Sequence, residues 1–316
     1  MMPKSVLVTG CAGFIGSNFV REFKARYPKT KIVGIDNFST GRRDALDRTI
    51  KFYEGSMCDE KLVLKIFKAH RPEYVFHFAA VPRVAYSVKH PAKTTEANIL
   101  GTVVLLEKSR DYRVKRFIYS SSSSVYGGAK LLPTKESENP PKPVSPYGLQ
   151  KYVGEPFCKI FSDLFGLDTV SLRYFNVFGP GQYGDSPYAT VICAWLEAIY
   201  TKKQRPFLEG DGKQSRDFSY VSNVVQANMN AMEAKKPLKG EVFNIGNGGR
   251  TDLLTVKHLI ERHTGKKLDL EKRPPRLGDV RHTHADISKA KKMLGYRPRV
   301  DFETGLVKTI QWFQAR

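Results

Sequence analysis

Tyr147 and Lys151 are the residues whose types and spacing point most directly to proton-transfer chemistry. They lie four positions apart in a segment expected to be helical, so their side chains share one face of the helix. An ammonium group beside a phenol favours the phenolate, which moves a pKa of about 10 toward the range of a useful base. Ser122 follows a predicted strand and can hold a substrate hydroxyl toward that phenolate. We therefore expect Ser122, Tyr147 and Lys151 to be the catalytic residues.

The segment Gly10–Gly16 has the glycine spacing of a dinucleotide-binding turn and lies between the first predicted strand and helix. Its glycines permit a tight turn and a close approach to a pyrophosphate, while the helix N-terminus supplies free N–H donors. Asp36 ends the second predicted strand, where a carboxylate binds a ribose 2′-hydroxyl and repels a 2′-phosphate. The pattern predicts NAD rather than NADP, although Arg42 and Arg43 could pair with a 2′-phosphate.

Alternating strand and helix patterns must position these residues. Short apolar runs predict strands and longer amphipathic runs predict helices. The order is typical of a Rossmann-type α/β fold, a doubly wound parallel sheet with its ligand at the C-terminal ends of the strands. The predicted strands are Ser5–Thr9, Lys31–Ile35, Tyr74–Phe78, Arg116–Ser120 and Thr169–Arg173, and the predicted helices are Phe14–Arg26, Lys61–Ala69, Pro91–Ser109 and Pro146–Phe165.

The second half of the chain is less regular. Beyond Gly179, helices are predicted at about 189–200, 221–234, 255–264, 287–294 and 303–313, between short strands and Gly/Pro loops. We expect residues 1–178 to form the NAD-binding domain, with about 217–245 threaded back into it. Residues 179–316 should mainly form a smaller, interleaved C-terminal lobe that binds the substrate.

The composition indicates a soluble globular protein. Of 316 residues, 41% are hydrophobic and 26% charged, and no apolar run approaches the roughly 18 residues that span a bilayer. The start has no secretory signal, and the four cysteines have no ligand spacing, so we expect a cytoplasmic protein without a metal site. The net charge of +21 could attract nucleic acid, but the basic residues are spread along the chain, which makes such a partner an unfavoured interpretation.

Motifs along the whole chain resemble the extended short-chain dehydrogenase/reductase family. They are GCAGFIG (10–16), HFAA (77–80), SSSSVYG (121–127), SPYGLQK (145–151) and RYFNVFGPGQ (173–182). Two later segments, GDGKQSRDFSYV (210–221) and RLGDVRHTHADISKAKKMLGY (276–296), resemble UDP-sugar 4-epimerases, most closely the bacterial UDP-N-acetylglucosamine 4-epimerases.

The resemblance implies a role for each matching position. Residues implied to bind NAD are Gly10, Gly13, Phe14, Ile15, Gly16, Asp36, Asn37, Thr40, Gly41, Ser56, Met57, Phe78, Ala79, Ala80, Asn98, Tyr147, Lys151 and Tyr174. Residues implied to bind the UDP-sugar are Ser122, Ser123, Tyr147, Asn176, Val191, Arg216, Arg276, Asp279 and Thr283. Arginine offers paired donors to phosphate and aspartate accepts from ribose hydroxyls, which suits these positions.

Two segments depart from the family's pattern. After the third strand the family carries an Asp that reads the adenine amino group, whereas this chain has Gly55-Ser56-Met57, and Asp59 lies three positions beyond Ser56. Pro82 and Arg83 stand in a loop that is richer in glycine in relatives, so contacts there do not transfer.

The reaction implied is a reversible 4-epimerisation through a 4-keto sugar. Related dehydratases carry an Asp-Glu pair where this chain has Ser123-Ser124, so dehydration is disfavoured. Thr283 matches the position at which a tyrosine closes the pocket near sugar C2 in strict galactose epimerases, so the smaller side chain favours UDP-GlcNAc and UDP-GalNAc, with UDP-Glc and UDP-Gal also open.

Other readings stay open. Basic residues such as Arg83 could face a carboxylate, which would suit a UDP-glucuronate 4-epimerase or decarboxylase. From another class, the charge suggests a catalytically silent NAD- or RNA-binding protein. The helices 91–109 and 146–165 resemble those that pair in a four-helix bundle in relatives, which implies a homodimer.

Overall fold

A parallel sheet of seven strands forms the centre of the computed structural model, which describes residues 2–184, 190–201, 205–274 and 280–316. The strand order is β11-β6-β5-β4-β1-β2-β3. Every neighbouring pair is parallel, as the doubly wound Rossmann-type prediction requires. The bounds are β1 (Ser5–Thr9), β2 (Lys31–Asp36), β3 (Lys51–Glu54), β4 (Tyr74–His77), β5 (Arg116–Ser122), β6 (Thr169–Tyr174) and β11 (Glu241–Ile245).

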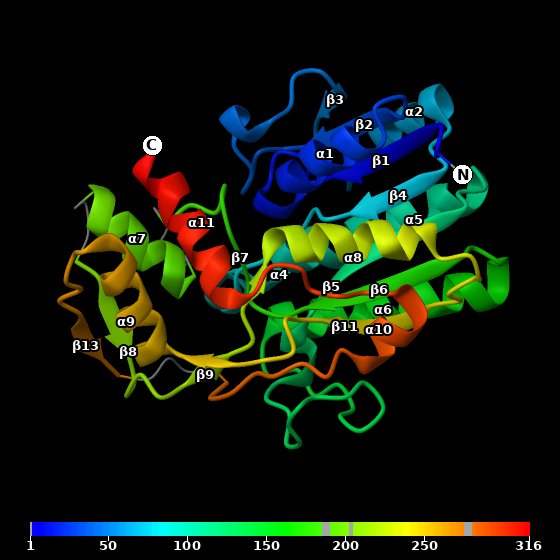
Figure 1. Ribbon diagram of the computed structural model, residues 1–316. Helices are drawn as coiled ribbons and strands as arrows, with labels where there is room; N and C mark the ends of the chain where they lie inside the picture. The colour runs from blue at the N-terminus through cyan, green and yellow to red at the C-terminus, as the bar shows by residue number, and fades with distance from the viewer. Residues whose placement is uncertain (1, 185–189, 202–204, 275–279) are drawn as a thin grey trace.

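Helices cover both faces of this sheet (Figure 1). On one face, α1 (Phe14–Arg26) and α8 (Val221–Glu233) pack side by side over a core that includes Phe19, Phe76 and Val224. On the other face, α2 (Glu60–His70), α5 (Gly101–Asp111) and α6 (Pro146–Phe165) bury a second core around Phe67 and Phe117. The strands are apolar along nearly their whole length because both faces are covered.

Local signals set the ends of α6, the helix that carries Tyr147 and Lys151. The Ser145 side chain accepts a hydrogen bond from the Gly148 N–H, and Pro146 occupies the first turn, where its missing N–H costs nothing. Gly166 ends the helix with φ of +67°, a conformation that glycine adopts without strain. The observed bounds equal the predicted ones.

The single helix predicted over 91–109 is wrong in detail. The segment consists of α4 (Pro91–Thr95), a π-helical turn η2 (Glu96–Leu100) and α5, and a further short helix, α3 (Val84–Lys89), precedes it. A π-turn inserts an extra residue and is often found at functional sites. Here it lets Asn98 turn inward and become buried.

The edge strand β3 has no counterpart among the predicted strands. Its four residues begin and end with exposed charged side chains, so no apolar run marks it. Two short 3-10 turns, η1 (Arg43–Ala45) and η3 (Ser123–Tyr126), were also not predicted. Most other predicted ends lie within two residues of the observed ones.

The smaller lobe lies at one end of the sheet (Figure 1). Its core includes Trp195, Phe218 and Ile260, contributed in part by α7 (Val191–Thr201), α9 (Leu253–Thr264) and α11 (Phe302–Gln314). The short strands pair as β10 (Ser219–Tyr220) with β7 (Val177–Phe178), β12 (Thr251–Asp252) with β9 (Ser215–Arg216), and β13 (Glu271–Arg273) with β8 (Phe207–Glu209). After β10, the chain returns to the large lobe through α8 and β11, and α10 (Ser288–Leu294) packs against β11.

Candidate active site

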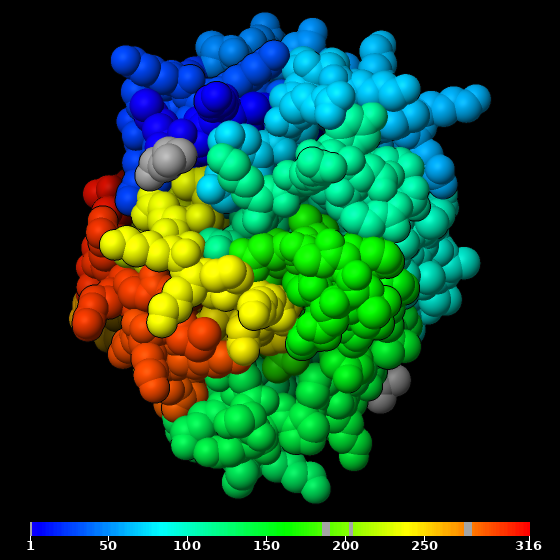
Figure 2. All heavy atoms as spheres, turned by 90° about the vertical axis from the view of Figure 1, so that its right-hand side faces the viewer, coloured from blue at the N-terminus to red at the C-terminus, as the bar shows by residue number. Residues whose placement is uncertain are grey.

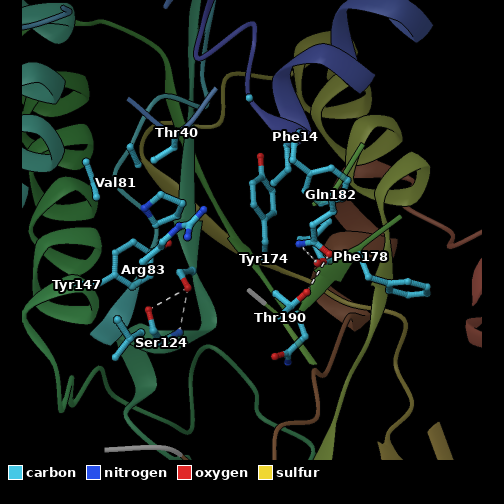
Figure 3. Close-up of a pocket in the computed structure, with 18 of the residues that line it drawn as sticks. Phe14, Thr40, Val81, Arg83, Ser124, Tyr147, Tyr174, Phe178, Gln182 and Thr190 are labelled. Carbon is cyan, nitrogen blue, oxygen red and sulfur yellow. Dashed lines mark hydrogen bonds between the residues drawn. The ribbon is translucent and has the colours of Figure 1, made fainter. Parts of the chain in front are cut away.

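A cavity of about 860 Å³ opens at the C-terminal ends of the parallel strands, between the two lobes. Figure 3 shows Thr40, Val81, Arg83 and Tyr147 on one side and Phe178, Gln182 and Thr190 on the other, with the Tyr174 ring between them. This is where a doubly wound sheet binds its ligand.

Ser122 and Tyr147 are brought together in this cavity. Ser122 is the last residue of β5 rather than the residue beyond it, and its Oγ accepts hydrogen bonds from the Ser124 N–H at 3.2 Å and hydroxyl at 2.9 Å. The Tyr147 N–H donates to Ser87 Oγ at 3.0 Å, which fixes the start of α6 against α3. Burial raises the pKa of Tyr147 to about 12, and a hydrogen bond with Ser122 opposes the rise. The serine therefore holds the phenol and favours its ionised form.

Lys151 is not arranged as expected. It is buried, and its Nζ donates to the Ser120 carbonyl at 2.8 Å. Burial lowers the pKa of Lys151 to about 7, and Lys151 is not among the groups that shift the pKa of Tyr147. Helical spacing places both side chains on one face, but the lysine satisfies its charge at the nearest carbonyl. Lys151 lies behind the cavity wall, one hydrogen bond from the strand that carries Ser122.

The backbone of the glycine turn is packed too closely for side chains at Gly10 and Gly16. A Cβ on Gly16 would lie 2.1 Å from the Gly10 carbonyl oxygen, and one on Gly10 would lie 2.8 Å from the Ala79 nitrogen. Gly10 also has φ of +68°. Gly13, Phe14 and Ile15 begin α1 at the cavity wall, where the first helical N–H groups have no partner within the helix. These donors fit a pyrophosphate.

The Asp36 carboxylate is held in place on the cavity wall by two backbone amides. Its carboxylate accepts from the Ala12 N–H at 2.9 Å and the Phe38 N–H at 2.8 Å, and it lines the cavity together with Asn37, Thr40 and Gly41. Burial raises the pKa of Asp36, while these two amides oppose the rise. A carboxylate here suits a free 2′-hydroxyl and conflicts with a 2′-phosphate.

The two arginines that could have read a 2′-phosphate are held by carboxylates. Arg42 donates to Asp44 at 3.1 and 3.2 Å, and Arg43 donates to Glu54 at 3.0 and 2.6 Å. Their charges are therefore offset within the protein. Together with Asp36, this arrangement fits NAD.

The segment Gly55-Ser56-Met57, which is expected to lie at the adenine, has no side chain that replaces the family's aspartate. Ser56 lines the cavity, and its Oγ accepts from the Cys58 N–H at 3.1 Å. Asp59 does not replace the family's aspartate, because its side chain caps α2 by accepting from the Leu62 N–H at 3.0 Å. Met57 also lines the cavity and packs beneath Gly101. Ser56 is thus the polar group presented at this end.

His77 shows how the wall bearing Phe78, Ala79 and Ala80 is fixed. The Thr9 hydroxyl accepts from the Ala79 N–H at 3.1 Å and so donates to His77 Nδ1 at 2.8 Å. The Thr102 hydroxyl donates to a carbonyl, so His77 Nε2 donates to Thr102 at 2.9 Å. Burial, then the nearby Lys151, lowers the pKa of His77 well below its usual value. The ring is therefore a neutral bridge between β1 and α5.

Asn98 does not line the cavity. Its side chain accepts from the Val81 N–H at 2.8 Å and donates to Gln150 Oε1 at 2.8 Å. It ties the loop after β4 to α6, which makes it a residue that positions the cofactor wall. The inward turn depends on the π-helix, which periodicity could not predict.

On the small-lobe side, the backbone of Asp217 is hydrogen-bonded to two of the candidate substrate residues, Asn176 and Thr283. Asn176 donates to Thr283 Oγ1 at 2.9 Å and to the Asp217 carbonyl at 3.3 Å, and the Asp217 N–H donates to Thr283 Oγ1 at 3.1 Å. The buried Asp217 carboxylate accepts from the backbone N–H groups of Asn247, Gly248 and Ala285. Arg216, its neighbour, lines the cavity and donates to the carbonyls of Ser215 and Arg281 at 3.0 Å.

Sequence reasoning did not single out Asp217 as a site residue. The sequence does offer a signal, because Asp217 follows Arg216 between two short strands. An acidic residue that is buried at such a place must have hydrogen-bond donors, and backbone amides can supply them. Of the other expected residues, Ser123, Tyr174, Asn176, Val191 and Thr283 line the cavity. Arg276 and Asp279 lie outside the described residues.

Comparisons with known proteins agree on one family. Residues 6–246 match the model of the NAD dependent epimerase/dehydratase family. The structure of a UDP-glucose 4-epimerase from Thermotoga maritima with UDP-glucose is 42% identical, covers 98% of this chain and 99% of its own, and gives a TM-score of 0.93. A UDP-N-acetylglucosamine 4-epimerase from Methanobrevibacter ruminantium with UDP-N-acetylmuramic acid is 37% identical, covers 100% and 99%, and gives 0.91. A UDP-glucuronate 4-epimerase from Thermodesulfobacterium geofontis is 34% identical over 321 residues, or 97% of this chain and 95% of that protein.

Proposed function

Since the chain belongs to the NAD dependent epimerase/dehydratase family, we propose that this NAD-dependent UDP-sugar 4-epimerase interconverts UDP-GlcNAc and UDP-GalNAc, and accepts UDP-Glc and UDP-Gal as well. The observation that carries the choice of sugar is Thr283, a small side chain on the cavity wall. Its hydroxyl is held by Asn176 and Asp217, so it is turned toward the protein. The space beside it suits an N-acetyl group.

Tyr147 is the acid and base of the reaction. Its phenolate removes the proton of the sugar 4-hydroxyl, and the same phenol returns a proton after the 4-keto sugar has turned over. Ser122 accepts two hydrogen bonds from Ser124, so its own hydroxyl hydrogen is free for the sugar oxygen or the phenol. NAD held by the glycine turn and Asp36 would supply the acceptor and donor for the hydrogen at C4 of the sugar.

Lys151 acts on Tyr147 indirectly, through the strand that carries Ser122. With a pKa lowered to about 7, it can carry or release a proton near neutrality while it holds the carbonyl of Ser120. Through this hydrogen bond Lys151 fixes the strand that carries Ser122, the residue that holds the Tyr147 phenol. Asp36, Asn37, Thr40 and the glycine turn bind the two ends of the cofactor. Tyr174 lies between the lobes, its hydroxyl fixed by Ser120 and Asn228 at 3.1 and 3.0 Å.

The nucleotide diphosphate of the substrate is proposed to bind on the small-lobe side. Arg216 offers a guanidinium to phosphate, and Asn176 lies on the same wall. Asn176 is held at φ of +28°, an uncommon conformation for a residue with a side chain. Val191, at the start of α7, contributes an apolar part of the same wall.

A UDP-uronic acid is the second candidate, because Arg83 lies on the cavity wall beside Tyr147 (Figure 3). A guanidinium at this place could pair with a C6 carboxylate. The relative from T. geofontis is named for this activity.

One experiment decides between these substrates. Purified protein is incubated with UDP-GlcNAc, UDP-Glc and UDP-glucuronate separately, and the products are followed by proton NMR. We expect both neutral sugars to epimerise. Turnover confined to UDP-Glc contradicts the proposed role of Thr283, and turnover confined to UDP-glucuronate supports the second candidate.

A homodimer is proposed from the exposed face of α6. Figure 2 looks onto the side of the molecule where α5 and α6 lie next to each other. Large apolar side chains are exposed on α6, among them Leu164 at 71%, with Leu149, Ile160 and Phe165 near half. Apolar surface concentrated on one helix favours a second copy as its partner. Light scattering after size exclusion tests this, and Leu164→Glu should shift the protein toward monomer.

No helix in the described part of the chain has the length and apolar character that crossing a membrane requires.

A further inference from the structure

Tyr183 lies where the chain leaves the large lobe for the small one, and its ring is contacted from both. The guanidinium carbon of Arg42, on the loop after β2, lies 3.9 Å from the ring centroid. The guanidinium carbon of Arg316, beyond α11, lies 4.3 Å from the same centroid. Trp312 packs edge to face against the ring at 5.3 Å. Cation–π contacts at such distances are attractive.

Each arginine is anchored within its own lobe. The Arg42 N–H donates to the Ala12 carbonyl at 2.9 Å, and its guanidinium is paired with Asp44. Arg316 pairs with Glu197 of α7 at 3.1 Å, and that carboxylate is nearly buried, with 4% of the side chain exposed. The tyrosine ring therefore links two fixed cations that belong to different lobes.

The segment around Tyr183 passes over the pyrophosphate end of the cavity. Asn18, on α1, donates to the Pro180 carbonyl at 2.9 Å and to the Phe14 carbonyl at 2.8 Å. Gln182 is held by its Nε2, which donates to the Val177 carbonyl, and by its Oε1, which accepts from Thr190 at 3.0 Å (Figure 3). Tyr183 and Arg42 both line the cavity.

The position of Arg42 gives the contact a consequence for the cofactor. Arg42 follows Gly41, whose backbone lies against Asp36 and Ala12 so closely that a Cβ would come within 2.9 Å of the Asp36 carboxylate. Arg42 is thus one residue beyond Gly41, which packs against the carboxylate proposed to bind the adenosine ribose. Separating Tyr183 from Arg42 would open the groove beside that ribose.

We propose that Tyr183 is a positioning residue that closes the small lobe over the adenosine half of the cofactor groove and slows the release of NAD. The inference rests on the proposed function, in which the cofactor is regenerated within each cycle. Loss of the reduced cofactor before the hydrogen returns would leave the 4-keto sugar stranded. A contact that joins the lobes beside the ribose keeps the cofactor in place for both halves of the reaction.

The test measures cofactor release without any sugar. Protein loaded with NADH is diluted into excess NAD, and the fall in bound NADH fluorescence gives the dissociation rate. We expect Tyr183→Ala to release NADH about tenfold faster, which corresponds to about 1.4 kcal/mol. Tyr183→Phe keeps the ring and loses only the hydrogen bond of its hydroxyl with Asp44, so release should be less than about threefold faster than in the wild type.

Arg316→Ala separates the linking role from a direct contact with cofactor. Arg316 is not part of the cavity wall among the described residues, so it affects release only indirectly, through its contacts with Tyr183 and with side chains of the small lobe. We expect release about threefold faster, with kcat at saturating NAD unchanged. Lys308→Ala, within α11, is the control.

Two results would overturn the proposal. One is a release rate for Tyr183→Ala within twofold of the wild type. The other is faster release that Arg316→Ala does not share, since this would make Tyr183 a simple contact of the cofactor. Arg316→Ala leaves the nearly buried Glu197 without its counter-charge, so the double variant Arg316→Ala/Glu197→Gln decides the matter if Tyr183→Ala does not fold. Failure to epimerise any particular UDP-sugar leaves the measurement unaffected.

Discussion

Glu155 and Arg173 form a buried, two-pronged ion pair directly behind the strand that ends in Ser122. Arg173 Nε lies 2.8 Å from Glu155 Oε1, and its second nitrogen lies 2.6 Å from Oε2. The Ser121 hydroxyl donates to the same Oε1 at 2.5 Å. The pair thus joins β5, β6 and α6, which carry Ser122, Tyr174 and Tyr147.

Breaking this pair should cost much of the protein's stability. Glu155→Gln leaves a buried guanidinium without its counter-charge, which costs about 3–5 kcal/mol. Urea unfolding followed by circular dichroism measures the loss. Lys159→Ala is the control, because it removes an exposed pair with Asp163 on the same helix and should change stability by less than about 0.5 kcal/mol. Equal effects of the two variants would contradict the role of the buried pair.

Removing the phenol should stop the reaction without emptying the site. Tyr147→Phe is expected to lower kcat by about 10²–10⁴-fold, the range for loss of a general acid–base group. The glycine turn and Asp36 are untouched, so the cofactor measured after denaturation should equal that of the wild type. Tyr152→Phe, one turn further along α6, should keep full activity. Turnover of Tyr147→Phe near the wild-type rate would remove Tyr147 from the mechanism.

The elements that position this chemistry were predictable because their signals are local. The apolar run Ser5–Thr9 is buried on both faces, and the capping residues Ser145 and Gly166 fix the ends of α6. Asp36 and the glycine turn could be placed on the cavity wall for the same reason, since they lie at the end of one strand and the start of one helix.

What could not be predicted depends on contacts far apart in sequence. The Lys151 ammonium group is held by the carbonyl of Ser120, and the spacing of residues within one helix cannot predict this contact. Asn98 points inward only because of a π-turn. Asp217 binds amides about 30 and 68 residues away, and Arg42 meets Tyr183 across the two lobes. No periodic pattern records such pairings.

Sugar selection should change when the wall beside Asn176 is filled. Thr283→Tyr is expected to lower kcat/KM for UDP-GlcNAc by about 100-fold, because the ring occupies the space of the N-acetyl group, and to affect UDP-Glc by less than about tenfold. Thr283→Ser keeps the hydroxyl that Asn176 and Asp217 use, so it controls for lost hydrogen bonds. Equal losses of kcat/KM for both sugars would mean that the substitution disturbs the folding of this wall and does not change the choice between the sugars.

Cofactor choice should depend on one carboxylate. Asp36→Ala removes the ribose acceptor, so the Kd of NAD is expected to rise about tenfold or more. The Kd of NADP should not rise, because the carboxylate does not bind a 2′-phosphate, so the ratio of the two Kd values should move toward one. Titration of the apo protein with each dinucleotide, followed by calorimetry, measures the ratio. Asp47→Ala removes an exposed carboxylate that binds Lys24 and Thr49 and should leave the ratio unchanged. An unaltered ratio in Asp36→Ala would shift cofactor selection to other groups.

Asp217 should make stability fall as pH rises, which is the reverse of the usual behaviour of a carboxylate. Burial raises the pKa of Asp217 to about 6 in the folded protein, against an ordinary value of 3.8, although backbone amides oppose the rise. Because the folded pKa is raised, Asp217 contributes its full share to the free energy of unfolding below about pH 4. This contribution is lost as the pH rises through about 6.

The matched comparison is with Asp217→Asn, whose side chain does not titrate. Its amide has one acceptor oxygen for three backbone donors, so the variant loses hydrogen bonds, and its own free energy of unfolding has no contribution from titration at this position. Between pH 4 and pH 7 the wild type should lose about 3 kcal/mol relative to this variant, as measured by urea unfolding. Asp211→Asn is the control, because pairing of Asp211 with the Lys213 amide and Arg281 lowers the pKa of that carboxyl and gives a trend of opposite sign. A wild-type minus Asp217→Asn difference that stays constant with pH would show that the carboxylate is already satisfied by its three amides.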